Sequence, residues 1–218
     1  MDLQENVPLA PLTTIGIGGP ARFFLRATSV DELREELAWA GDRPVFLLGG
    51  GSNLLISDAG FDGLVIHLDL RGITVESEDE HAMVKVAAGE PWDEFVEATV
   101  LHAWSGLEAL SGIPGLTGAT PVQNVGAYGA DVSQTIASVR TWDREVNAVK
   151  TFANSDLRFG YRDSVLKQTT TNGSPRFVVL TVQFQLAPSR LSAPIRYAEL
   201  ARSLAVEVGE RAKANDVR

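Results

Sequence analysis

The chain has 218 residues, a hydrophobic content of 44%, no cysteine and a formal net charge of −9. A chain of this length and hydrophobicity can form one or two globular domains with a buried core. The acidic balance argues against non-specific binding to nucleic acid, whose phosphates are contacted mainly by clustered Lys and Arg. Without cysteine there are no disulfides, thiolate nucleophiles or thiolate metal ligands.

The remaining metal and membrane signals are also missing from the sequence. His67, His81 and His102 are scattered without ligand spacing, so we expect no metal site. No apolar run reaches the roughly 18 residues of a membrane-spanning helix, and residues 1–10 show no signal-peptide pattern. We therefore expect a cytoplasmic protein with neither membrane nor nucleic acid as a partner.

The N-terminal part of the chain predicts two strands, over residues 21–26 and 45–48, with a helix between them. Ser29 and Glu32 have the spacing of a capping box, and Gly41 ends the helix. Its apolar face is expected to consist of three residues, Val30, Leu33 and Leu37.

The sequence GGGSN, Gly49 to Asn53, follows the second strand. A Rossmann dinucleotide fingerprint needs GxGxxG running into a helix, whereas here Leu54 to Ile56 continue as an apolar, β-like run. We interpret GGGSN as a glycine-rich loop between strands, whose amides and Ser52 hydroxyl could hold a phosphate. Taken alone, an ordinary tight turn explains it equally well.

Next along the chain, residues 63–70, 73–76 and 83–87 are predicted to form a small antiparallel meander, with an acidic turn at 76–81. Pro91 occupies the first position of a predicted helix that ends near Gly106. Trp92 and Trp104 are interpreted as core residues.

The stretch Ser111 to Gly129, SGIPGLTGATPVQNVGAYG, has five glycines and two prolines, which break helices and remove ladder donors from strands. A long irregular run inside a compact domain is usually functional. Glycine permits close approach to a ligand and lets backbone N–H groups turn inward toward an anion. We predict that this segment wraps a phosphate-bearing ligand. The alternative is an idle surface loop, against which its apolar residues argue.

Beyond this segment, residues 137–142 and 149–152 predict a hairpin, 177–186 a long strand, and the residues from Tyr197 onward a helix. Between hairpin and strand lies RFGYRDSVLK, Arg158 to Lys167, a positive island in an acidic chain. Such an island suits an anionic substrate group. A solvated charged turn is the competing interpretation.

The motifs GGGSN, SGIPGLTGATPVQNVGAYG, RFGYRDS and IRYAEL, in this order, resemble the UDP-N-acetylenolpyruvoylglucosamine reductases of bacterial cell-wall synthesis over nearly the whole chain. The resemblance implies an α+β fold, the FAD-binding fold of the vanillyl-alcohol-oxidase type, with two α+β subdomains. The implied division is residues 1–70 for FAD-binding subdomain 1, 71–190 for FAD-binding subdomain 2, and 191–218 for the start of a substrate-binding domain.

The same resemblance implies the residues of the site. Those expected against FAD are Gly49, Gly50, Gly51, Ser52, Asn53, Leu54, Gly112, Ile113, Pro114, Gly118, Ala119, Thr120, Val122, Gln123, Asn124, Gly126, Ala127 and Val179. Arg162, in GYRDS, matches the catalytic arginine of the family. Tyr128, Arg162 and Tyr197 are the expected substrate-binding residues.

The implied enzyme is an NADPH-dependent, FAD-containing UDP-N-acetylmuramate dehydrogenase of peptidoglycan precursor synthesis, expected as a monomer. NADPH is the co-substrate, passing hydride to the flavin, which passes it to the enolpyruvyl group of the UDP-sugar. A fixed guanidinium such as Arg162 would stabilise the charge that builds up on the substrate carboxylate.

The sequence departs from the family pattern at its end. It stops at Arg218 without the GSFFKNP-like motif that carries the family's proton-donating serine, so that role is assigned to no residue. We expect the N-terminal portion of a longer reductase. The alternative function is a flavin- or nucleotide-binding module without turnover.

Overall fold

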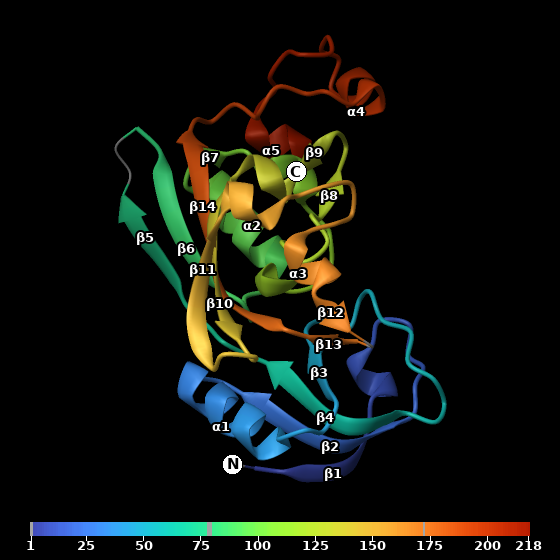
Figure 1. Cartoon of the computed structure of the whole chain (residues 1–218). Coiled ribbons are helices and arrows are strands. Elements are labelled where there is room, and N and C mark those ends of the chain that lie inside the picture. Colours follow the sequence, from blue (N-terminus) through green and yellow to red (C-terminus); the bar gives the residue numbers. More distant parts are fainter. Residues whose placement is uncertain (1, 78–79, 172) are drawn as a thin grey trace.

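The computed structural model describes residues 2–77, 80–171 and 173–218. Two β-sheets lie at different levels of the molecule, and the C-terminal residues cover the end farthest from the N-terminus (Figure 1). The acidic turn predicted at 76–81 includes residues 78 and 79, which fall outside the described residues.

The smaller sheet has four strands in the spatial order β1 (Gln4–Pro8), β2 (Pro20–Ala27), β4 (Phe61–Leu68) and β3 (Val45–Leu48). β1 runs antiparallel to β2, whereas β2 and β3 both run parallel to β4. The predicted meander was therefore wrong for its first strand, because β4 belongs to this sheet and does not pair with the strands that follow it. Its other two strands, β5 (Ile73–Ser77) and β6 (Ala82–Ala87), do pair antiparallel as predicted. Parallel strands bring their carboxyl ends to one edge, so Leu48 and Leu68 end side by side.

Helix α1 (Val30–Ala40) connects β2 to β3. The Ser29 hydroxyl accepts a hydrogen bond from the Glu32 N–H at 3.1 Å, as the capping signal predicted. The Glu32 carboxylate binds the N–H of Thr28 at 2.8 Å rather than that of Ser29, so the box is displaced by one residue. The buried face consists of Leu33, Glu36 and Ala40, while the expected Val30 and Leu37 are only half-buried.

The larger sheet is antiparallel throughout, in the order β11 (Ala148–Ala153), β10 (Ile136–Asp143), β14 (Phe177–Pro188), β6 (Ala82–Ala87) and β5 (Ile73–Ser77), with β7 (Trp104–Ser105) pairing the end of β14. Near the start of β14, Arg176 donates two hydrogen bonds to the buried carboxylate of Asp143, at 3.0 and 2.8 Å. These charge-assisted bonds fix the start of the strand.

Helix α2 (Trp92–Leu101) packs on the larger sheet. The rings of Trp92, Phe95 and Phe184 meet with centroids 5.1 to 6.0 Å apart, within the range of favourable aromatic contacts. The helix ends earlier than predicted, at Leu101, and Ala103 then takes a left-handed backbone with φ 57°. Pro91 is the N-cap and not the first helical residue.

The remaining elements are short. They are η1 (Ala10–Leu12), η2 (Glu108–Leu110), η3 (Thr117–Ala119), β8 (Gly126–Ala127), β9 (Ala130–Asp131), η4 (Val132–Gln134), η5 (Asn154–Leu157), α3 (Val165–Gln168), β12 (Thr170–Thr171), β13 (Ser174–Pro175), α4 (Ala198–Ser203) and α5 (Ala214–Val217). Residues 54–56, predicted as β-like, form no strand. One sheet uses residues up to 68 and the other begins at 73, but the division into domains stays a prediction.

Candidate functional site

The glycine-rich turn after β3 is pressed between two other segments. A Cβ atom on Gly51 would lie 2.0 Å from the Leu12 carbonyl oxygen, and one on Gly50 would lie 2.9 Å from the Cα of Gly115. Gly51 also has φ 65°, a conformation that favours glycine. These two positions therefore need glycine for the turn to close against both neighbours.

Two side-chain hydrogen bonds join this turn to the segment Ser111 to Gly129, about sixty residues later. Ser52 donates its hydroxyl to the Pro114 carbonyl at 3.2 Å, and Asn53 donates its amide to the Gln123 side chain at 3.0 Å. The two glycine-rich motifs that the sequence singled out thus form one surface.

The first turn of α2 holds the long glycine-rich segment from the other side. Trp92 donates its backbone N–H to Gly115 and its indole N–H to Leu110, both at 3.0 Å. The N–H of Gly118 donates to the Ala88 carbonyl at 2.9 Å, and a Cβ atom on Gly118 would lie 2.5 Å from the Ala88 methyl carbon. This close packing places the segment against the end of β6.

Asp93 adds a further fixed contact at the start of the glycine-rich segment. Its carboxylate accepts the Gly112 N–H at 2.7 Å and the Arg218 guanidinium at 2.9 Å. The Gly112 hydrogen bond, reinforced by Arg218, holds the pKa of Asp93 below its usual value. The ionised carboxylate is therefore the form present at neutral pH.

Between the two sheets, these segments enclose a cavity of about 340 Å³. This volume is within the range of about 300 to 1,000 Å³ found for small-molecule and cofactor sites. The predicted cofactor residues that line it are Gly49, Gly51, Ser52, Asn53, Leu54, Ile113, Pro114, Gly118, Ala119, Thr120, Val122, Gln123 and Val179. The predicted residues that do not line it are Gly50, Gly112, Asn124, Gly126 and Ala127.

Sequence reasoning missed a second group of lining residues: Leu47, Leu68, Ala88, Trp92, Gly115, Leu116, Val125, Lys167, Thr170, Gly173, Pro175 and Phe177. Leu47 and Leu68 lie near the carboxyl ends of β3 and β4, which only the parallel pairing brings together. Gly115 and Leu116 lie within the glycine-rich segment itself. The sequence did point to Lys167, as part of the positive island, whereas no sequence pattern pointed to the hairpin β12–β13.

The lining chemistry fits a dinucleotide. Near the glycine-rich turn after β3, the lining offers glycine backbone and hydroxyl groups. The rest of the lining is mostly apolar. Among the lining residues that the structure describes, Lys167 alone carries a charge. An anionic cofactor would therefore meet loop amides, the Ser52 hydroxyl and one ammonium group.

The positive island lies beside this cavity. Ser164 is buried and donates its hydroxyl to the Val122 carbonyl at 2.5 Å, which pins the island to the glycine-rich segment. Arg162 donates to the Gly126 carbonyl at 2.7 Å, and Lys167 donates its Nζ to the Arg162 carbonyl at 2.8 Å. Arg162 does not line the cavity, but both of its anchors hold it next to the wall.

Several non-glycine residues around the site adopt left-handed backbone, which costs of order 1 to 3 kcal/mol for most residue types. They include Asn124, Tyr128, Arg158 and Arg162, with φ between 45° and 54°. Asn124 is buried and joins two loops, because its amide donates to the Gly160 carbonyl at 3.1 Å while its oxygen accepts the Ser133 N–H at 3.1 Å. The strain falls where the two loops meet.

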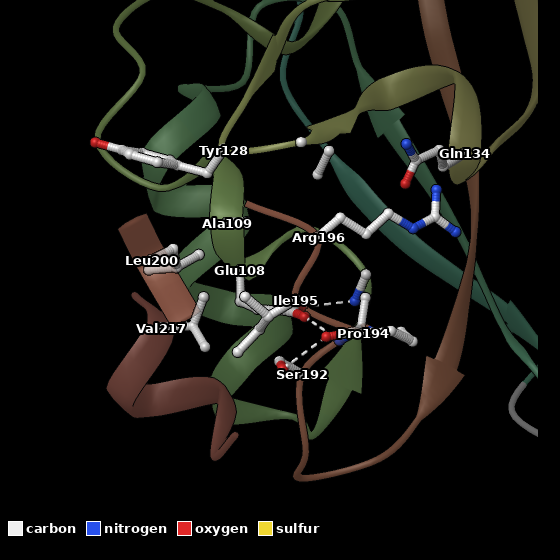
Figure 2. A pocket seen from close by; sticks show the side chains of 14 residues that line it. Glu108, Ala109, Tyr128, Gln134, Ser192, Pro194, Ile195, Arg196, Leu200 and Val217 are labelled. Carbon is white, nitrogen blue, oxygen red and sulfur yellow. Dashed lines mark hydrogen bonds between the residues drawn. The ribbon is translucent and has the colours of Figure 1, made fainter. Parts of the chain in front are cut away.

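All three tyrosines of the chain are exposed: Tyr128 at 55%, Tyr161 at 94% and Tyr197 at 41%. Tyr128 and Tyr197 form an edge-to-face pair with centroids 5.8 Å apart. Tyr128, Glu108 and Arg196 border a second, smaller cavity of about 40 Å³. Figure 2 shows the side chains that line it. The predicted substrate-binding residues Tyr128 and Tyr197 are thus neighbours.

Two negative findings apply to the described parts of the chain. Within residues 2–77, 80–171 and 173–218, no group of three or more His, Asp or Glu side chains has the geometry to hold a metal ion. Over the same residues, no helix is long and apolar enough to cross a membrane.

Two sheets that enclose a glycine-lined cavity of this chemistry define a dinucleotide-binding module. The sequence profile described as "FAD binding domain" matches residues 21–151, and the chain belongs to this family. FAD is accordingly its cofactor, as predicted.

Two comparisons extend over most of the chain. It is 49% identical, over 217 residues, to a UDP-N-acetylenolpyruvoylglucosamine reductase of Cutibacterium acnes, a match covering 98% of this chain and 57% of the relative. The crystal structure of the corresponding reductase (MurB) of Thermus caldophilus superimposes with a TM-score of 0.68 at 29% identity, covering 86% of this chain and 64% of that chain. The predicted resemblance is confirmed, and the chain spans little more than half the length of the Cutibacterium relative.

A protein of lower sequence identity shares the fold. A 6-hydroxy-D-nicotine oxidase of Arthrobacter nicotinovorans superimposes with a TM-score of 0.58 at 18% identity, over 78% of this chain and 38% of that chain. This likeness concerns the fold alone, and with the family match it confirms the predicted α+β FAD-binding fold.

Proposed function

We propose that this chain is the flavin-binding part of a UDP-N-acetylenolpyruvoylglucosamine reductase, which reduces a UDP-sugar enolpyruvate to UDP-N-acetylmuramate with NADPH through FAD. The observation that carries the proposal is the single cavity formed by both glycine-rich motifs, with Arg162 held beside it. The 49% identity to a reductase of that name supports the same substrate class.

The cavity lining is the proposed FAD site. Bound FAD supplies a hydride carrier between NADPH and the enolpyruvyl double bond. The turn Gly49 to Asn53 offers backbone N–H groups to the pyrophosphate. The Ser52 hydroxyl would join them by turning away from the Pro114 carbonyl, since it has a single proton to donate. The segment from Ile113 to Gln123 offers an apolar wall to the flavin. Two aromatic residues from other parts of the chain, Trp92 and Phe177, also line the cavity.

Arg162 is the proposed catalytic residue, since it would contact the reacting substrate. One guanidinium nitrogen is committed to the Gly126 carbonyl, which leaves the other donors of the fork for a carboxylate. A cation held in place before the reaction stabilises charge as it develops, without reorganisation during the step. Tyr128 and Tyr197 are the other residues proposed to contact the substrate.

The remaining parts of the proposal concern organisation. We infer two FAD-binding subdomains, residues 1–70 and 71–190, and the start of a substrate-binding domain at 191–218. The protein is proposed to act as a monomer in the cytoplasm, with the UDP-sugar and NADPH as its partners.

Turnover tests this function. Two proteins are compared under saturating FAD: the chain itself, and the chain joined to the part of the Cutibacterium relative that it does not match. Both are expected to bind FAD, and the joined protein is expected to oxidise NADPH only when the UDP-sugar enolpyruvate is present. A joined protein that binds FAD yet oxidises no NADPH when the sugar is present would instead indicate a flavin-binding module without turnover.

A further inference from the structure

Glu108 is a buried carboxylate for which the proposed reaction has no use. The residue is 2% exposed and lies in η2, directly before the glycine-rich segment. Its Oε2 accepts the Gly106 N–H at 2.7 Å, and its Oε1 accepts the Ala193 N–H. A buried carboxyl group requires hydrogen-bond partners, and the two amides supply one for each of its oxygens.

The Ala193 contact anchors a larger unit than one residue. Residues 191–195 run beside residues 209–214, through hydrogen bonds from Ser192 N to Ala212 O at 2.8 Å and from Ile195 N to Glu210 O at 2.8 Å. The Ser192 hydroxyl also accepts the Ala212 N–H at 3.2 Å. Glu108 therefore binds one edge of a C-terminal lobe, which we define as residues 189–218.

The same lobe carries Tyr197 toward the cofactor loop. Ala193 precedes Tyr197 by four residues, and the Tyr197 ring lies against the ring of Tyr128. Gly129 permits this approach, because a Cβ atom there would lie 3.3 Å from the Cβ of Arg196 and its φ is 78°. Figure 2 shows Glu108 and Ser192 on one side of the small cavity and Tyr128 on the other.

We propose that Glu108 is a positioning residue, which fixes the C-terminal lobe at Ala193 so that Tyr197 stays beside Tyr128. The consequence for substrate binding rests on the proposed function of Tyr197. The anchoring itself does not, because it concerns only contacts within this chain.

Limited trypsin digestion of the 218-residue chain tests the anchor. Glu108→Gln keeps the side-chain shape but offers only one acceptor oxygen to two N–H groups. Cleavage after Arg196 is expected to accelerate about tenfold or more, the scale of losing one charge-assisted hydrogen bond to local opening. Cleavage after Arg158, on a different loop, should stay within about twofold of the parent.

Glu94→Gln is the matched control, since Glu94 is exposed on α2 and undergoes the same chemical change. Equal cleavage after Arg196 in parent and Glu108→Gln would overturn the proposal. Equal acceleration after Arg196 and Arg158 would overturn it as well, because Glu108 would then stabilise the whole domain and not the lobe.

A second variant approaches the same bond from the donor side. Ala193→Pro removes the N–H, and residue 193 already precedes Pro194, which restricts it to extended backbone compatible with proline. It should reproduce the cleavage pattern of Glu108→Gln. The double variant should be cleaved after Arg196 no faster than either single variant, because both changes break the same hydrogen bond. Additive acceleration of cleavage in the double variant would contradict the proposed anchoring by Glu108. If Glu108→Gln does not fold, the cleavage rate of Ala193→Pro tests the proposal by itself.

A kinetic readout connects the anchor to substrate. In the joined protein, Glu108→Gln should raise the KM for the UDP-sugar about tenfold with FAD affinity unchanged, and should add nothing further when Tyr197→Ala is already present. Independent, additive effects on KM would overturn the link to Tyr197. Failure of the proposed function would show instead as no sugar-dependent turnover in the parent, while the digestion result would still stand.

Discussion

At the residue scale, Arg162 combines strain with two anchors. It sits at φ 54° with its guanidinium on Gly126 and its carbonyl held by Lys167. Such a residue is fixed before substrate arrives, which is what electrostatic stabilisation of a developing charge needs. The strained backbone at Arg162 is thus consistent with its proposed catalytic role.

Replacing Arg162 tests that role directly. In the joined protein, Arg162→Ala should leave FAD bound but slow reoxidation of reduced flavin by the UDP-sugar about a hundredfold, the usual scale for one lost stabilising group. Stopped-flow absorbance measures this half-reaction separately from reduction by NADPH. Arg158→Ala is the control, because Arg158 is exposed on the same loop and also has a left-handed backbone. Equal reoxidation rates in Arg162→Ala and parent would remove Arg162 from the mechanism.

Lys167 is the second residue whose charge should matter. FAD carries a pyrophosphate, and no other lining residue among those described offers a charged side chain. Lys167→Met should weaken FAD binding about tenfold, the scale of one hydrogen bond to a charged group, whereas Lys167→Arg should retain most of the affinity. Fluorescence titration measures both, with Lys213→Met as an exposed control. Unchanged affinity in Lys167→Met would show that backbone amides suffice.

At the scale of elements, α1 contains an unusual core residue. Glu36 is buried among Leu33 and Ala40, and its Oε2 has no hydrogen-bond partner among the described residues. Burial, with smaller contributions from Glu32 and Glu35, raises the pKa of its carboxyl from 4.5 to about 7.

This shift makes stability depend on pH in a defined direction. Between pH 4.5 and about 7, the unfolded chain has lost the Glu36 proton while the folded chain retains it, so stability falls as pH rises. Glu36→Gln should therefore raise the free energy of unfolding by roughly 1 to 3 kcal/mol at about pH 8, with a much smaller effect near pH 4.5. Denaturant titrations at the two pH values measure the difference. An equal gain at both, or none beyond that of Glu94→Gln, would contradict it.

The elements also show how far sequence reasoning reaches. Strands with strong apolar patterns, such as β3 and β14, were predicted to within two residues, because their side chains decide their burial. The pairing partners of β4 were not predicted. Its pairing with β2 and β3 depends on the crossover through α1, and no local sequence pattern records this pairing. The end of α2 was predicted too late because Ala103, a good helix former, takes a left-handed conformation in the tertiary structure.

The site was predictable to a similar degree. The glycines at 49, 51 and 118 and the polar residues Ser52 and Gln123 were expected and line the cavity. Phe177 and the hairpin β12–β13 were not expected, because they reach the cavity only through the fold. Asn124 was expected against the cofactor, but it bridges two loops behind the lining.

At the scale of the whole molecule, the cavity depends on both sheets and on the close contact of the two glycine-rich motifs. Ligand binding to the folded state alone raises stability by about 2.7 kcal/mol at a hundred times Kd. If FAD fills this cavity, it should therefore stabilise the two sheets together. Gly118 is the most direct place to disturb the site, because its added Cβ would meet Ala88 at 2.5 Å without any demand on φ.

The central claim, that FAD binds in this cavity, is tested most directly by titrating the 218-residue chain with FAD and following flavin fluorescence and thermal unfolding together. One FAD should bind per chain and raise Tm. Gly118→Ala should weaken binding about tenfold or more through a clash of the 1 to 3 kcal/mol scale, and Gly160→Ala, whose Cβ would have 3.7 Å of room, should not. Binding of FAD with equal affinity to parent, Gly118→Ala and Gly160→Ala, or no binding by the folded parent, would contradict the account.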